Sequence, residues 1–104
     1  MRIELQAPKG QVKEWILNLL KRKLIDLHIM HPEIASAQVR MREANKTQKS
    51  VSIDLTIKGA SVFFNQSASS FEKACMFVLV EVEKKLKHLI PHMNVIAAKR
   101  LRTI

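Results

Sequence analysis

Residues 51–58 read VSIDLTIK, the most regular alternation of apolar and polar side chains in the chain. A period of two indicates a β-strand with one buried face and one solvated face. Gly59 follows and predicts a tight turn. A further strand is expected from about Ala60 to Ser67, with Val62 and Phe64 pointing inward. The hairpin therefore predicts an antiparallel sheet that is apolar on one side only.

Two other alternating stretches lie earlier in the chain. Residues 1–7 carry apolar side chains at alternate positions, and a second stretch starts at Ala35 and reaches Arg42. The polar residues 44–49 between this stretch and residue 51 predict a hairpin loop. We therefore expect four strands, with the first beside the second and the last three in an antiparallel meander.

Two segments show the helical spacing of apolar residues. The first covers residues 11–28, and the second begins near Phe71 and continues to Leu89. Ser69 and Glu72 have the spacing of a capping box at the start of the second helix. Pro91 should end or kink that helix.

The predicted element order is β-α-β-β-β-α. Each strand has one apolar side, so both helices must cover the same face of the four-stranded sheet. This α+β layout is similar to that of double-stranded-RNA-binding domains. Residues 1–91 are expected to form the folded domain, and residues 92–104 a basic C-terminal tail whose structure the sequence leaves open.

Positive charge is concentrated at the C-terminal end of the chain. The 104 residues carry a net charge of +9, from 18 basic and 9 acidic side chains. The segment from residue 84 to residue 104 has no acidic residue, and its basic residues are Lys84, Lys85, Lys87, Lys99, Arg100 and Arg102. Such a footprint favours a nucleic-acid partner. Charge alone leaves an anionic membrane surface as the second possibility.

The sequence argues against several other classes of protein. A single cysteine, Cys75, excludes an internal disulfide, fits a reducing compartment and predicts an inert core thiol. The N-terminus has no apolar core typical of a signal peptide. The longest apolar run, residues 74–80, is too short to span a bilayer. We expect a cytoplasmic protein without membrane association.

Catalytic and metal-binding motifs are missing from the sequence. The histidines at positions 28, 31, 88 and 92 lack the spacing of known zinc sites and are interpreted as structural or surface residues. No serine has a recognisable activating partner, and no glycine-rich phosphate loop is present. We therefore predict no enzymatic activity, no catalytic residue, no metal, no cofactor and no small-molecule substrate.

Residues 1–90 resemble the ribosome hibernation-promoting factor family, also called ribosome-associated inhibitor A or sigma-54 modulation proteins. The resemblance rests on the helix that starts VKEW at Val12, the VRMR strand from Val39, the GASVFF hairpin from Gly59, and Phe71 opening a helix that closes on Lys-Lys-Leu. Asp26 departs from the family, which usually has a basic residue at that position. We expect the short form of the family, without the separate dimerisation domain of the longer members.

The resemblance implies a non-enzymatic protein that binds ribosomal RNA of the small ribosomal subunit near the decoding region and blocks messenger and transfer RNA. The family's basic helix surfaces face that RNA. By position, the RNA-binding residues would be Lys21, Arg22, Lys23, Lys84, Lys85 and Lys87, with Lys99, Arg100 and Arg102 added by charge.

Each of these interpretations has an alternative. Lys23 is in phase with the apolar stripe of the first helix, so it either extends its amine out at the stripe's edge or lies in the groove between the helices. The lysines of the second helix could simply complement the helix dipole. Arg40 and Arg42 are interpreted as ordinary surface residues of the open sheet face, where Phe63 is the one candidate for base stacking.

A rival hypothesis comes from the second helix, which is apolar nearly all round in its middle. Met76, Phe77 and Val80 lie away from the main apolar stripe. They either pack against the first helix or form a patch for self-association. The rival function is a protein-interaction or homodimerising module. The expected oligomeric state is a monomer or a weak homodimer.

Overall fold

A computed structural model describes the backbone of residues 1–102 and the side chains of residues 1–88. The elements follow one another as β1 (Arg2–Gln6), α1 (Glu14–Met30), β2 (Ile34–Asn45), β3 (Gln48–Ile57), β4 (Ala60–Ala68) and α2 (Phe71–Arg102). The order β-α-β-β-β-α confirms the prediction from the sequence.

The four strands form one sheet in the order β1-β2-β3-β4. β1 runs parallel to β2, whereas β2, β3 and β4 form the predicted antiparallel meander. The parallel pair requires a crossover between β1 and β2, and α1 supplies it. The strand order places the first strand beside the second, as expected.

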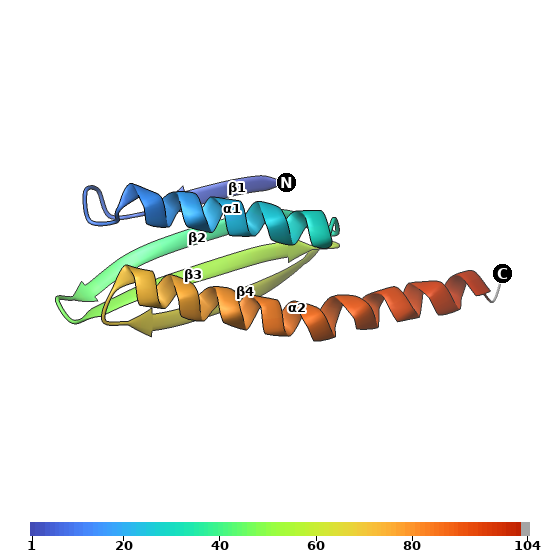
Figure 1. Cartoon of the computed structure of the whole chain (residues 1–104). Helices are drawn as coiled ribbons and strands as arrows, with labels where there is room; N and C mark the ends of the chain where they lie inside the picture. Colours follow the sequence, from blue (N-terminus) through green and yellow to red (C-terminus); the bar gives the residue numbers. More distant parts are fainter. Residues whose placement is uncertain (103–104) are drawn as a thin grey trace.

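Both helices cover the same face of the sheet (Figure 1). α1 contacts β1, while α2 packs on β3 and β4. Four apolar side chains of β3 point toward the core and are fully buried: Val51, Ile53, Leu55 and Ile57. They meet the apolar stripes of both helices in a single core that contains Leu20, Leu24, Val78 and Leu86. Within residues 1–102, no element covers the opposite face of the sheet (Figure 1).

Two local predictions were wrong. Residues 44–49 do not form a loop, because the ladder of β2 and β3 continues to the pair Asn45–Gln48 and leaves only two residues in the turn. The side chain of Asn45 accepts hydrogen bonds from the backbone N–H and the hydroxyl of Thr47 at 2.9 and 2.8 Å, which closes this turn. The cap of α2 is Ser70 instead of Ser69, since its Oγ accepts the N–H of Lys73 at 3.2 Å.

Pro91 does not end the second helix. α2 continues through it to Arg102, although proline offers no N–H to the carbonyl one turn before it. The helix therefore extends past the sheet (Figure 1). The proposed boundary between residues 1–91 and residues 92–104 falls within this helix and stays a prediction.

Candidate nucleic-acid interface

The basic residues of α1 lie on three different sides of the helix. Consecutive helical residues are about 100° apart, so Lys21, Arg22 and Lys23 spread over about 200° of its circumference. All three side chains are exposed. Lys23 is adjacent to the buried Leu24 and borders the buried stripe, where a lysine stem can follow the helix surface while its amine reaches water.

The basic residues of α2 divide into two kinds. Lys84 and Lys87 are exposed and lie outside the buried stripe, which continues through Val82 to Leu86. Lys85 borders that stripe, and its Nζ lies 5.4 Å from the centre of the Phe64 ring on β4. This is a cation–π geometry, so the packing of α2 on β4 helps to position the Lys85 amine.

A groove between α2 and β4 adjoins Lys85. Gln66 donates a hydrogen bond from its amide to the Glu81 carboxylate and ties the strand to the helix. Phe77, Val80 and Lys84 line the groove as well. Lys84 and Lys85 thus lie beside the outer edge strand of the sheet. Of the six predicted helix cations, Lys84 and Lys85 line this groove.

Among residues 1–88, no helix cation forms an ion pair with a carboxylate. Among the residues with described side chains, the two ion pairs are Arg2–Glu4 at 2.8 Å and Lys49–Glu43 at 3.3 Å, and both belong to the sheet. The helix lysines are consequently available to an external anion. Lys99, Arg100 and Arg102 have side chains outside the described residues.

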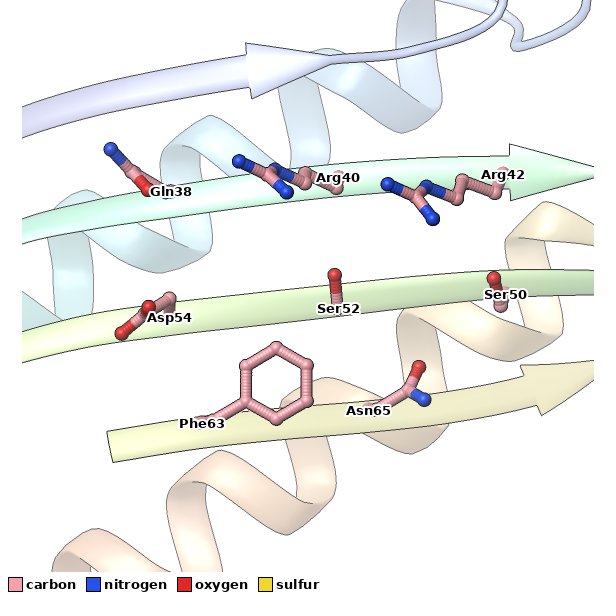
Figure 2. Close-up of a pocket in the computed structure, with 8 residues that line it drawn as sticks. All are labelled: Gln38, Arg40, Arg42, Ser50, Ser52, Asp54, Phe63 and Asn65. Carbon is pink, nitrogen blue, oxygen red and sulfur yellow. The ribbon is translucent and has the colours of Figure 1, made fainter. Parts of the chain in front are cut away.

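A second polar surface lies on the uncovered face of the sheet (Figure 2). Side chains from three strands surround a shallow concavity there, including those of Arg40, Arg42, Asp54 and Phe63. The alternation in the sequence predicts an open sheet face, with Arg40 and Arg42 as ordinary surface residues. The missing information was the register between strands, which brings residues far apart in the sequence into one cluster.

The remaining candidate residues have simple environments. Cys75 is buried, and burial raises the pKa of its thiol to about 12, which fits the predicted inert core thiol. No group of three or more possible metal ligands occurs among the described residues. Within the same part of the chain, neither helix combines the length and apolar character needed to cross a bilayer.

The apolar residues of the rival hypothesis are exposed. Met76, Phe77 and Val80 are each about half accessible to solvent and do not enter the core. Their exposure leaves a surface that a partner could cover, as the self-association hypothesis requires. At the end of α1, Ile29 and Met30 are 70% and 71% exposed, a second apolar surface that the sequence analysis missed. The sequence contains a sign of this surface: Pro32 limits the helix to the residues before it, so the apolar Ile29 and Met30 fall at its end.

Two solved structures of other proteins have the same architecture as this chain. A ribosomal subunit interface protein from Coxiella burnetii superposes with a TM-score of 0.72 over 84% of this chain and 94% of its own, at 17% sequence identity. The N-terminal domain of Protein Y from Thermus thermophilus gives a TM-score of 0.69 at 19% identity, over 84% of this chain and 97% of its own. The chain shares their fold. No protein-family profile matches the sequence, and no curated protein sequence matches it significantly.

At these identities the likeness establishes the fold and leaves the residues to be argued from this chain. The coverage of both solved chains is nearly complete, so the common part is the whole sheet with both helices. The α+β fold predicted from the side-chain pattern is thereby confirmed.

Proposed function

We propose that this protein binds ribosomal RNA of the small subunit, near the decoding region, through the basic surface of its two helices. Bound there, it would exclude messenger and transfer RNA and hold the ribosome inactive in the cytoplasm. The activity is binding without catalysis. The fold shared with a ribosomal subunit interface protein and with Protein Y supports the ribosome as the partner.

One observation carries the choice of surface. Lys84 and Lys87 are exposed on α2, and neither takes part in an ion pair among the described side chains. From residue 84 onward the sequence has no acid to compete with an RNA phosphate. Lysines without a carboxylate partner release condensed counterions from RNA when they bind phosphates, and this release drives association. Such contacts orient a protein on folded RNA without reading its sequence.

The test is cosedimentation of the purified chain with small ribosomal subunits at several salt concentrations. The double variant Lys84→Glu/Lys87→Glu should lose binding at physiological salt. Loss of two phosphate contacts should also flatten the slope of log affinity against log salt by about 1.4–1.8. Lys85 is left unchanged, because its contact with Phe64 would mix a packing effect with the loss of charge.

The matched control is Lys9→Glu/Lys46→Glu, two exposed loop lysines whose reversal changes the net charge equally. This control should weaken binding only slightly. Equal losses from the two double variants would indicate attraction by net charge and would contradict a helix-face site. Full binding by the Lys84→Glu/Lys87→Glu variant would also reject the proposal.

The exposed residues Met76, Phe77 and Val80 support a second candidate function, self-association through α2. These residues lie within about 100° of the helix circumference, so a second copy could cover them together. Light scattering should then give a mass that rises with concentration, and Phe77→Ser should abolish the rise. A constant monomer mass at high concentration would remove this candidate.

A further inference from the structure

The uncovered face of the sheet carries a concavity of about 310 Å³ that the proposed helix-face function does not use (Figure 2). Its walls come from alternate residues of β2, β3 and β4, whose side chains point away from the core. Strand pairing sets these residues in rows across the sheet. One row contains Gln38, Asp54 and Phe63, and the next contains Arg40, Ser52 and Asn65.

Two guanidinium groups follow one another along β2. Arg40 and Arg42 are exposed, and neither belongs to the two ion pairs found among the described side chains. Their neighbours on β3, Ser52 and Ser50, are small and neutral, so they leave the guanidinium groups uncovered. Residues two apart on a strand are separated by about 7 Å. This spacing is similar to that of successive phosphates along an extended single strand, and guanidinium is suited to bidentate phosphate contacts.

An exposed aromatic ring completes the far side of the concavity. Phe63 is 60% exposed, and Figure 2 shows its ring leaning from β4 toward β3. A phenyl ring held on a sheet surface offers a face on which a nucleic-acid base can stack. β2 and β4 are two strand spacings apart, about 10 Å. A base over Phe63 would therefore place one flanking phosphate near Arg40, one row along the sheet, and the next phosphate of the strand near Arg42, two rows along.

Beside the ring lies an unsatisfied acceptor. Asp54 pairs with Phe63 across the two strands, and its Oδ1 has lost contact with water without gaining a hydrogen bond. A ligand N–H donor that reached this covered atom would supply the missing hydrogen bond. Guanine is the one RNA base whose Watson–Crick edge presents two adjacent N–H donors, which match the two oxygens of a carboxylate.

We infer that this sheet face is a second nucleic-acid site, which holds a short single strand with a guanine base on Phe63 and its phosphates on Arg40 and Arg42. Asp54 gives the preference for guanine. RNA-recognition motifs stack two or three bases on such a sheet, whereas the described residues of this face include one aromatic ring, that of Phe63. The site therefore binds weakly and reads one base.

The experiment measures fluorescence anisotropy of labelled pentanucleotides, UUGUU and UUAUU, with the full chain. UUGUU should bind more tightly. Phe63→Ser should weaken the binding of UUGUU at least about fivefold, the lower end of what a stacked base contributes. Asp54→Asn should remove the preference for guanine while raising the affinity for UUAUU, because a negative charge near the phosphates is lost. Arg40→Gln/Arg42→Gln should flatten the salt slope by about 1.4.

Two controls separate a site from general attraction. Trp15→Ser removes an aromatic side chain of similar exposure, 48%, from the helical layer, and should leave the affinity unchanged. Lys9→Gln/Lys46→Gln removes the same charge as the double arginine variant and should flatten the salt slope less. Should Phe63→Ser fail to fold by circular dichroism, Phe63→Trp provides the test, since a larger ring should tighten binding. Equal effects of Phe63→Ser and Trp15→Ser, or equal affinity for both oligonucleotides, would overturn the inference.

These outcomes are independent of ribosome binding. A pentanucleotide has no folded structure for the helical layer to recognise, and Lys84→Glu/Lys87→Glu keeps the whole sheet face. Loss of ribosome binding with unchanged guanine preference would support both sites as separate. Failure of the oligonucleotide assay would remove the sheet site and leave the helix-face proposal intact.

Discussion

The contact between Lys85 and Phe64 decides whether one of the proposed RNA-binding cations is held in place before binding. The Nζ lies 5.4 Å from the ring centre, and the Phe64 ring is fully buried between β4 and α2. A cation–π contact at an exposed lysine contributes about 0.5–1 kcal/mol. Fixing a lysine in advance matters because an immobilised long side chain otherwise costs about 0.5–1.5 kcal/mol on binding.

A double-mutant cycle with Lys85→Gln and Phe64→Leu measures this contact. In urea unfolding, Lys85→Gln should lower the free energy of unfolding by about 0.5–1 kcal/mol. Phe64→Leu should lower it more, by roughly 1–2 kcal/mol, because it makes a core side chain smaller. The double variant should be more stable than the sum of the two losses predicts, by about 0.5–1 kcal/mol. A coupling below about 0.3 kcal/mol, the usual limit of additivity, would show that the Lys85 amine is free in solvent. Lys84→Gln provides the matched control and should show no coupling to Phe64, because Lys84 has no cation–π partner among the described side chains.

Three further predictions concern the fold. Ser70→Ala should lower the free energy of unfolding, measured in urea, by about 1 kcal/mol because the cap of α2 is lost. Ser69→Ala should change it by less than about 0.5 kcal/mol. A larger loss for Ser69→Ala than for Ser70→Ala would contradict the cap assignment. Lys58 has a φ of 50° in the β3–β4 turn, a left-handed conformation that asparagine tolerates better than lysine. Lys58→Asn should therefore raise the free energy of unfolding by up to about 1 kcal/mol in the same assay. A lower free energy of unfolding would refute strain at this position. A chain without residues 92–104 should still melt cooperatively by circular dichroism, because the described core ends at Leu86. The same deletion should weaken cosedimentation with small ribosomal subunits. Unfolding of the truncated chain would reject the domain boundary.

The elements that the sequence predicted best are those in which side-chain pattern and burial coincide. Every apolar residue of VSIDLTIK is buried, and one-sided burial of the strands was enough to place both helices on one face. The β2–β3 turn was misjudged for a physical reason. Asn45 and Gln48 pair through their backbones, and this pairing requires no apolar side chain, so hydropathy gave no sign that the strands continued.

The sequence predicts which residues make up the candidate site, but it predicts only part of their arrangement in space. Net charge pointed to Lys84 and Lys87, and the helical period alone shows that Lys21, Arg22 and Lys23 point in different directions. The contact of Lys85 with Phe64 depends on how α2 sits on β4, which no local pattern contains. The sheet-face cluster was the hardest to foresee, because Arg40, Asp54 and Phe63 meet only through the register of two strand pairs.

The two proposed surfaces differ in the arrangement of their charges, and this difference constrains how RNA could contact them. On α2 the lysines have no carboxylate partner among the described residues, and the helix continues past the sheet. That arrangement suits the extended phosphate lattice of folded RNA, which is recognised by shape and charge. On the sheet, Arg40 and Arg42 share their concavity with the carboxylate of Asp54, so the attraction of a phosphate is weaker and depends more on its direction of approach. Because the sheet separates the two surfaces, a folded RNA on the helices would leave the opposite face open to a single strand.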